Sequence, residues 1–424
     1  MYGRKGKRVA ITGIKGFNDI LPNEVEKWHH IESAARRVFE LYGFSEIRIP
    51  VLEKTELFSR SIGDATDIVE KEMYSFTDKG ENRVTMRPEG TAGVMRSFIE
   101  HKLYAGDQVS KLYYLGPMFR YERPQKGRYR QFHQIGVELV GVDDPMADAQ
   151  VLTMLQHFFA ELGLHEPTLQ INSLGCPECR PSYRQKLRDF LLERLERLCD
   201  DCKRRYENNP LRALDCKAAG CREATVDAPS VLDNLCSGCA DHFEKTQNYL
   251  RVNGTPYEIN ARMVRGLDYY TRTTFELVTG LLGAQSAVAA GGRYDSLIEQ
   301  LGGPSLPGIG FAMGVERVVL LLNQDDFRKS PDLFIAFLGE AARKEAFRLM
   351  CALQQEGISV EIDYEGKSLK SQMRRADKFN SRFTLILGED ELRKGTASLK
   401  DMDKGVQVDV PLVPEKIVSM VQSA

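Results

Sequence analysis

The stretch that decides the fold is GPMFRYERPQKGRYRQFHQ, residues 116–134. Residues 120–130 hold five Lys or Arg, together with a proline and a glycine. The pattern predicts a strand, a basic turn and a second, alternating strand. Such a hairpin would carry cations at its tip and Arg120, Gln134 and Glu138 on the sheet. Arg suits the bidentate capture of phosphate oxygens. A solvated charged hairpin would show the same charge run, but Arg and Glu at the sheet end favour a functional site over it.

Further strand patterns surround this hairpin, and short or irregular links join most of them. They cover residues 44–49, 83–86, 111–115, 132–140, 169–171, 273–278 and 286–290, after a helix over 22–42. Links of this kind favour an antiparallel sheet with helices on one side. We therefore expect an α+β domain made of residues 1–173 and 251–325.

Two other regions differ from the sheet domain in their composition and in their pattern of helices and strands. Residues 174–250 are helical and rich in cysteine, which indicates an inserted domain. Residues 331–424 alternate strand and helix (strands 333–338, 359–362 and 383–387; helices 340–355 and 367–380), which predicts a separate α/β domain. One helix there carries cations at helical spacing: Lys367, Lys370, Arg374 and Lys378. A plain solvated helix would show the same pattern, so RNA contact is one of two interpretations.

The composition excludes several classes of protein. The 424 residues include 58 Lys+Arg and 60 Asp+Glu, a formal charge of −2. No apolar run reaches the ~18 residues that span a bilayer, and the basic N-terminus lacks the apolar segment of a secretory signal. We expect a cytoplasmic protein with no membrane partner, whose nucleic-acid contacts use local basic patches.

Eight of the nine cysteines form four close pairs: Cys176 with Cys179, Cys199 with Cys202, Cys216 with Cys221 and Cys236 with Cys239. In a reducing compartment this spacing indicates metal rather than disulfides. The pairs could form two tetrahedral Zn²⁺ sites or fewer, and reduced thiols left from a degenerate site are the alternative. Cys351 fits a core position in a helix.

Four more clusters could carry chemistry, although each could also be structural. Glu89 stands where a helix starts, so it could simply complement the helix dipole. Tyr269 and Tyr270, if extended, would place one hydroxyl on each face. Arg317 follows glycines on an apolar helix and needs an anionic partner. The fourth cluster is the glycine turn 291–295.

With these residues in view, the sequence strongly resembles the bacterial histidyl-tRNA synthetases over essentially its whole length. Residues 43–50, 119–132 and 310–317 resemble the three motifs of class II aminoacyl-tRNA synthetases, the first of which builds the dimer interface. Residues 265–270 and 291–295 resemble segments peculiar to the histidine enzymes.

The resemblance implies ATP-dependent attachment of L-histidine to tRNA(His) through a histidyl-adenylate, with release of AMP and pyrophosphate. It also implies a homodimer, ATP as a substrate, Mg²⁺ and a C-terminal anticodon-binding domain. By resemblance, Arg120 and Arg265 are catalytic and bind the α-phosphate from two sides. The expected histidine-binding residues are Glu89, Thr91, Arg120, Gln134, Glu138, Arg265, Tyr269 and Tyr270. The expected ATP-binding residues are Arg120, Glu122, Phe132 and Arg317, and Arg123 and Gln125 are expected at the tRNA acceptor stem.

Two binding proteins would share much of this sequence. One is a regulatory paralogue that binds histidine and activates a partner enzyme, and the other is a synthetase-like sensor of uncharged tRNA. A regulatory paralogue usually loses the C-terminal domain and the phosphate-binding arginines, and this chain keeps both. The enzyme is therefore the favoured interpretation.

Overall fold

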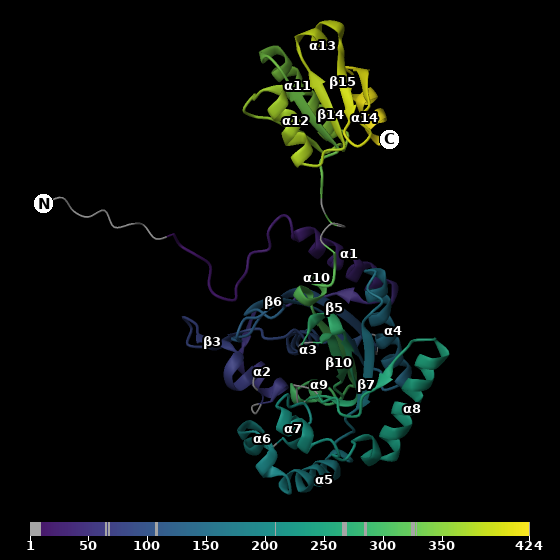
Figure 1. Cartoon of the computed structure of the whole chain (residues 1–424). Coiled ribbons are helices and arrows are strands. Elements are labelled where there is room, and N and C mark those ends of the chain that lie inside the picture. Colours follow the sequence, from purple (N-terminus) through teal and green to yellow (C-terminus); the bar gives the residue numbers. More distant parts are fainter. Residues whose placement is uncertain are drawn as a thin grey trace, which may run out of the picture. The chain divides into compact units, whose positions relative to one another are not determined.

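The computed structural model describes residues 10–63, 66, 68–106, 109–207, 209–264, 269–283, 286–323, 327 and 329–423. The chain divides into two compact units, Met1–Gln324 and Asp325–Ala424. The first unit contains two sheets and the second unit contains one (Figure 1).

The first unit is built on an eight-stranded sheet in the order β1-β5-β6-β11-β10-β9-β7-β8. Its strands are β1 (Ser45–Glu46), β5 (Ser110–Phe119), β6 (Gln131–Val140), β11 (Gly308–Gly314), β10 (Ala287–Arg293), β9 (Thr271–Val278), β7 (Thr168–Ser173) and β8 (Glu258–Ile259). All pairs are antiparallel except the outermost two, β1–β5 and β7–β8. The predicted antiparallel sheet is confirmed, and β5 and β6 form the predicted basic hairpin.

Helices α1 (Val25–Leu41) and α4 (Pro145–Glu161) pack together beside this sheet. The apolar stripe of α1 buries Trp28, Ile31 and Val38, as its spacing predicts. The strand expected over residues 44–49 is much shorter than predicted. Only Ser45–Glu46 pairs as β1, although the Ile47 N–H still donates to the Tyr113 carbonyl (2.8 Å). Further along, the Ile49 carbonyl accepts a hydrogen bond from the Arg87 side chain (2.6 Å).

A second, three-stranded sheet has the order β2-β4-β3. Its strands are β2 (Leu52–Lys54), β3 (Tyr74–Thr77) and β4 (Arg83–Met86). The other helical segments described in this unit, outside the insertion, are α2 (Thr55–Ile62), η1 (Ile68–Glu72), α3 (Thr91–Glu100), η2 (Leu103–Ala105), η6 (Gly280–Leu282), α9 (Leu297–Gln300) and α10 (Val315–Val319). Strand β4 matches its prediction end to end, and it leads directly through Glu89 into α3.

The cysteine-rich insertion is helical, as expected (teal in Figure 1). It contains α5 (Arg180–Leu192), η3 (Leu195–Arg197), α6 (Asp200–Arg205), η4 (Pro210–Ala213), α7 (Ala219–Ala224), η5 (Leu232–Asn234) and α8 (Ser237–Val252). Helix α8 packs along α4, and there the buried Asp148 joins His242 to Arg293. The insertion is thereby tied to the sheet.

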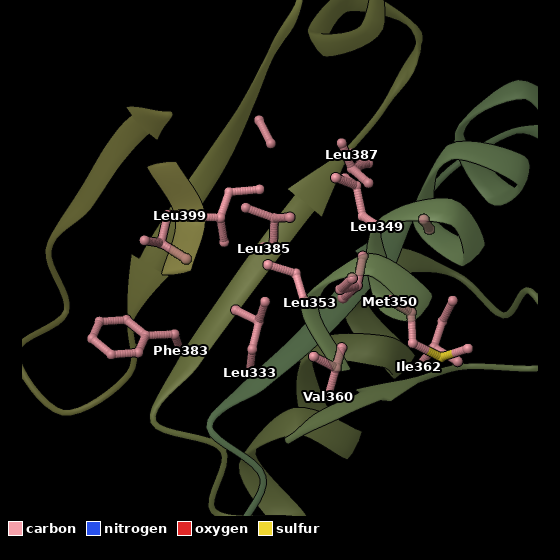
Figure 2. Packing of buried hydrophobic residues seen from close by; sticks show 14 of the residues in the cluster. Leu333, Leu349, Met350, Leu353, Val360, Ile362, Phe383, Leu385, Leu387 and Leu399 are labelled. Carbon is pink, nitrogen blue, oxygen red and sulfur yellow. The ribbon is translucent and has the colours of Figure 1, made fainter. Parts of the chain in front are cut away.

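The second unit has a mixed sheet in the order β13-β12-β14-β15-β16. Its elements are β12 (Leu333–Phe337), α11 (Glu340–Gln355), β13 (Val360–Ile362), α12 (Leu369–Lys378), β14 (Phe383–Leu387), α13 (Glu389–Lys394), β15 (Thr396–Asp401), β16 (Gln407–Pro411) and α14 (Pro414–Gln422). Figure 2 shows the core, where Leu349 and Leu353 of α11 face Leu333, Leu385 and Leu399 of the sheet. The predicted α/β domain is confirmed, and Cys351 is half-buried against this core.

Among the residues that the structure describes, no helix is both long enough and apolar enough to cross a membrane.

Candidate active site

One cavity of about 400 Å³ lies over the middle strands of the eight-stranded sheet. It brings together almost every predicted histidine- and ATP-binding residue: Glu89, Thr91, Arg120, Glu122, Phe132, Gln134, Glu138, Tyr269, Tyr270 and Arg317. These residues come from the β5–β6 hairpin, the start of α3, the strand-end segment before β9, and α10. Residues far apart in the sequence therefore share one pocket.

Glu138 is fully buried at the floor of this pocket. Strand β11 leaves space for the Glu138 side chain at Gly310, the residue paired with Glu138. A Cβ added at Gly310 would come within 2.2 Å of Glu138 Oε2. The Tyr294 hydroxyl donates a hydrogen bond to the same oxygen. Burial raises the pKa of the Glu138 carboxyl to about 8.

Two buried oxygens in the pocket are left over for a ligand. Glu138 Oε1 and Gln134 Oε1 are buried, and neither has a hydrogen-bond partner among the described residues. Buried polar atoms are rarely left unpaired in folded proteins. The pocket therefore offers a polar ligand two hydrogen-bonding oxygens that the fold does not satisfy by itself.

Glu89 stands at the start of α3 and also lines the cavity. Its carboxylate accepts hydrogen bonds from the backbone N–H groups of Thr91 (2.7 Å) and Ala92 (2.9 Å), at the start of α3. This is the helix-start role, and Glu89 also lines the cavity. Burial raises the pKa of its carboxyl, although the two N–H donors act in the opposite direction.

Arginine side chains form a cationic wall in the same cavity. Arg120 donates to the Pro88 carbonyl (2.8 Å), and its guanidinium lies 5.3 Å from the centre of the Phe132 ring. Arg317 donates to the carbonyls of Ala287 (2.6 Å) and Gly127 (3.3 Å). Burial, with repulsion from Arg128 and Arg120, lowers the pKa of Arg317. This crowding of cations is favourable once an anion such as a phosphate binds.

Arg128 is a functional candidate that the sequence did not single out. It lines the cavity and forms an ion pair with Glu122. Other lining residues that were missed include Tyr129, Asp215, Glu276 and Glu316. Tyr294 belongs to the segment 291–295, whose place in a resembling segment was the available signal. The glycine turn predicted there was wrong, because residues 291–293 continue β10 and pair with both neighbouring strands. Asp215 had no such signal, because only the folding of the insertion brings it to the pocket.

The two adjacent tyrosines do not lie as predicted. Tyr269 and Tyr270 are both buried, their ring centres are 4.8 Å apart, and both line the cavity. The expectation of one hydroxyl on each face was wrong, because the chain is not extended here: β9 begins only at Thr271. Arg265, the second predicted catalytic arginine, lies outside the described residues.

Arg123 and Gln125, the predicted tRNA-binding residues, lie on the turn between β5 and β6. Both side chains are exposed, and neither lines the cavity. The main chain of Gln125 exchanges hydrogen bonds with Arg128 (2.9 and 3.0 Å), which fixes the tip of the hairpin. The hairpin thus presents one set of polar side chains outward and another, including Arg120, into the pocket.

The eight paired cysteines gather into two groups of four free thiols. Cluster 1 comprises Cys176, Cys179, Cys236 and Cys239, and cluster 2 comprises Cys199, Cys202, Cys216 and Cys221. All four sulfur atoms of each cluster lie within 4.8 Å of one another. Each cluster is a complete set of ligands for a four-coordinate metal ion.

Comparison with known proteins agrees with this site. Residues 16–318 match the family model for histidyl-tRNA synthetase, and residues 332–423 match that for the anticodon binding domain. The chain is 76% identical to the histidine–tRNA ligase of Geobacter sulfurreducens over 97% of its own length and 100% of that protein. It is 65% identical to the histidine–tRNA ligase of Trichlorobacter lovleyi, over 97% of this chain and 99% of that one.

Solved structures show the same likeness. The apo histidyl-tRNA synthetase of S. aureus matches with a TM-score of 0.79 and 36% identity, covering 98% of this chain and 99% of that one. An ATP phosphoribosyltransferase regulatory subunit/histidyl-tRNA synthetase from Bacillus halodurans matches at 21% identity with a TM-score of 0.65, over 90% and 99% of the two chains. This second likeness shows the fold alone.

The antiparallel sheet, its arginine-walled pocket and the C-terminal anticodon-binding domain together define a class II aminoacyl-tRNA synthetase. Within that class, the chain belongs to the histidyl-tRNA synthetase family.

Proposed function

We propose that the chain ligates L-histidine to tRNA(His), and that the 400 Å³ cavity is where histidine reacts with ATP. The observation that carries this proposal is the fully buried Glu138, whose free oxygen faces the same cavity as the arginine wall. Such a pocket combines a hydrogen-bonding group for a polar ring with cations for a phosphate. A histidyl-adenylate contains both an imidazole ring and a phosphate.

The polar floor suits histidine. An imidazole ring offers one hydrogen-bond donor and one acceptor nitrogen, and a carboxyl beside a phenol can complement both. Glu138 and Tyr270 are assigned to the imidazole, whereas Glu89, Thr91 and Gln134 are assigned to the α-amino group. An apolar mimic would leave these buried groups unpaired, so the site should discriminate strongly against it.

The arginine wall suits ATP. When the histidine carboxylate attacks the α-phosphorus, negative charge develops on the phosphate oxygens, and fixed guanidinium groups stabilise that charge. Arg120 is assigned to the α-phosphate and Arg317 to the γ-phosphate, with Phe132 against the adenine. Arg265 is assigned to the opposite side of the α-phosphate, by resemblance alone.

The lining residues also fit Mg²⁺, which the family implies. Mg²⁺ binds carboxylate oxygens together with substrate phosphates, and Glu122 and Glu276 line the cavity near the arginine wall. These two carboxylates would hold a Mg²⁺ that neutralises charge on the outer phosphates and on the departing pyrophosphate.

The proposal is tested by amino-acid-dependent exchange of labelled pyrophosphate into ATP. We expect exchange with histidine and not with the other standard amino acids. A histidine-binding regulatory protein or an uncharged-tRNA sensor would bind its ligand without exchange, so failure of exchange by intact protein would contradict the proposal.

We further propose that the enzyme is a cytoplasmic homodimer whose interface includes residues 43–50, and that Arg123 and Gln125 contact the acceptor stem. The support is the match of these segments to family motifs and the exposure of both side chains. Light scattering should give twice the 47.9 kDa of one chain. Arg123→Ala should weaken transfer of histidine to tRNA and leave pyrophosphate exchange unchanged.

We also propose that clusters 1 and 2 each bind one Zn²⁺. Zn–S bonds of about 2.3 Å in a regular tetrahedron place neighbouring sulfurs about 3.8 Å apart. Cys176 Sγ lies 3.8 Å from both Cys179 Sγ and Cys236 Sγ, and Cys199 Sγ lies 3.8 Å from Cys216 Sγ. A backbone N–H group also donates to sulfur in cluster 2 (Cys199 N to Cys221 Sγ, 3.1 Å), and hydrogen bonds of this kind orient metal ligands.

Elemental analysis of purified protein tests the metal proposal. We expect about two zinc ions per chain. Less than about half an equivalent would favour the alternative of reduced thiols without metal.

A further inference from the structure

The two cysteine clusters are connected to the active-site pocket as well as to the insertion. In cluster 1, Cys179 immediately precedes α5, so Arg180 is the next residue along the chain. The Arg180 guanidinium donates a hydrogen bond to the main-chain carbonyl of Tyr270. Tyr270 lines the cavity. The residue next to a predicted metal ligand therefore contacts the pocket wall.

The chain on the other side of cluster 1 is fastened to the same segment. Leu174 N donates to the Arg272 carbonyl (2.7 Å), and Arg272 N donates to the Gly175 carbonyl (2.9 Å). Arg272 has φ of +44°, a left-handed conformation that costs a residue other than glycine free energy. Contacts from both sides of cluster 1 therefore hold the pocket segment in a conformation it would not keep alone.

Cluster 2 reaches the pocket more directly. Cys216 follows Asp215, and Asp215 is the residue by which the insertion lines the cavity. On the other side of the cluster, the Thr225 hydroxyl donates to the Cys221 carbonyl (2.8 Å). Thr225 in turn accepts two hydrogen bonds from the Arg262 guanidinium, at 2.5 Å on its carbonyl and 2.8 Å on its hydroxyl. Arg262 precedes the pocket tyrosines in the chain.

The helices that carry cluster 2 are too short to be stable by themselves. Helices α6 and α7 have only six residues each, far fewer than the ~12 at which an isolated helix becomes even marginal in water. Cys202 and Cys221 lie in the core of the insertion, together with apolar side chains of α5 such as Tyr183 and Leu187. A metal bound by the cysteines would act with that core to hold the short helices in place.

We infer that the two zinc clusters position the pocket wall: cluster 1 holds Arg180 on the Tyr270 carbonyl, and cluster 2 holds Asp215 at the cavity. This inference rests on the proposed function and adds two positioning contacts to it. Arg180 acts through Tyr270, so its loss should change histidine binding before it changes ATP binding. The zinc ions themselves take no part in the reaction.

The first test concerns Arg180. Arg180→Met should raise the KM for histidine in pyrophosphate exchange by up to about tenfold, because the Tyr270 main chain loses its hydrogen bond from a charged donor, with little change in the KM for ATP. Arg180→Lys should recover part of the loss. The matched control is Lys186→Met on the same helix, because Lys186 is exposed and donates to Asn234 within the insertion. A general loss of folded protein would lower kcat without this split between substrates.

The second test joins the contact to the metal in a double-mutant cycle. Cys236→Ser should remove one zinc ion and raise the KM for histidine. If cluster 1 acts through Arg180, the Cys236→Ser, Arg180→Met double variant should be no worse than the worse single variant. In cluster 2, Cys216→Ser and Asp215→Asn should each lower kcat/KM for exchange, and the double variant should be no worse than the worse single variant. Cys351→Ser, outside both clusters, should keep the zinc and the activity of the wild type.

The inference and the function on which it rests can fail separately. If wild-type protein shows no histidine-dependent exchange, the proposed function fails. If wild-type protein is active but contains no zinc, or if the paired changes are additive, the coupling of clusters to pocket is overturned. An unchanged KM for histidine in Arg180→Met would overturn it equally.

Discussion

The Tyr294 hydroxyl donates a hydrogen bond to the buried carboxyl of Glu138. Tyr294 follows β10 and Glu138 lies in β6, on opposite sides of β11, so the contact crosses the glycine-lined strand between them. Gly308 and Gly310 leave the space for it, since a Cβ at either position would meet the Tyr294 ring (2.3 Å) or Glu138 (2.2 Å). A buried polar pair is thereby built into the sheet, directly beneath the cavity.

The Glu138 carboxyl should make stability fall as the pH rises. In the folded chain its pKa is about 8, against an ordinary value of 4.5. Between these values the unfolded chain binds fewer protons than the folded chain. The contribution of this group to the free energy of unfolding is therefore complete below about pH 4.5 and is lost progressively up to about pH 8. Glu138→Gln should flatten this slope, which thermal unfolding at several pH values measures.

The same substitution should weaken histidine binding by about tenfold above pH 8, where the Glu138 carboxyl is ionised, because its charge-assisted hydrogen bond with an imidazole N–H becomes a neutral one. Calorimetric titration with histidine gives the affinity. An affinity equal to that of the wild type would contradict the assignment of Glu138 to the ring.

Gly310→Ala should damage the floor of the pocket. The added methyl group would meet Glu138 Oε2 and the Val137 carbonyl at 2.2 Å, so the strand or the carboxyl must move. Overpacking of this kind costs about 1–3 kcal/mol of stability, and displacement of Glu138 should raise the KM for histidine. The control is Gly280→Ala, where nothing lies within 4 Å of the added Cβ.

Arg265 lies outside the described residues, and its role stays a prediction from resemblance. Arg265→Ala should cut adenylate formation far more than it cuts histidine binding, because a cation at the α-phosphate stabilises charge that appears in the transition state. Pyrophosphate exchange compared with histidine titration separates the two effects. Near-wild-type exchange in this variant would remove Arg265 from the mechanism.

Helix α12 of the second unit should contribute to RNA binding. Lys370, Arg374 and Lys378 recur every fourth residue and are exposed, while Met373 packs inward against a small core. Replacing all three cations with Gln should weaken tRNA binding and reduce the dependence of log affinity on log salt by about 0.7–0.9 for each phosphate that the helix no longer neutralises. Exchange without tRNA should be unaffected. An unchanged salt slope would support the alternative of a solvated helix.

Local patterns in the sequence were sufficient to predict much of the fold. Strand β14 and helix α11 match their predicted ranges end to end, since apolar runs and helical periodicity are local signals. Helix α4 was missed because it buries residues around most of its circumference, so its amphipathic period is weak. Strand β11 was read as a glycine-rich approach to a helix, because glycine has low strand propensity; its glycines in fact make room for neighbouring side chains.

Part of the site could also be predicted from local patterns, and part could not. Arg120, Gln134 and Glu138 could be predicted because one hairpin carries all three at a regular alternation. Asp215 could not, because only tertiary folding brings the insertion to the pocket. The boundaries expected for the insertion and the two flanking domains stay predictions.

The central claim is that Arg120 and its neighbours activate histidine with ATP in this one cavity. The most direct test is the rate of histidine-dependent pyrophosphate exchange in Arg120→Met compared with the wild type. We expect the rate to fall by about 10²-fold or more, as when one fixed donor to a developing oxyanion is removed, in protein that still unfolds at the wild-type temperature. Undiminished exchange in that variant would contradict the account.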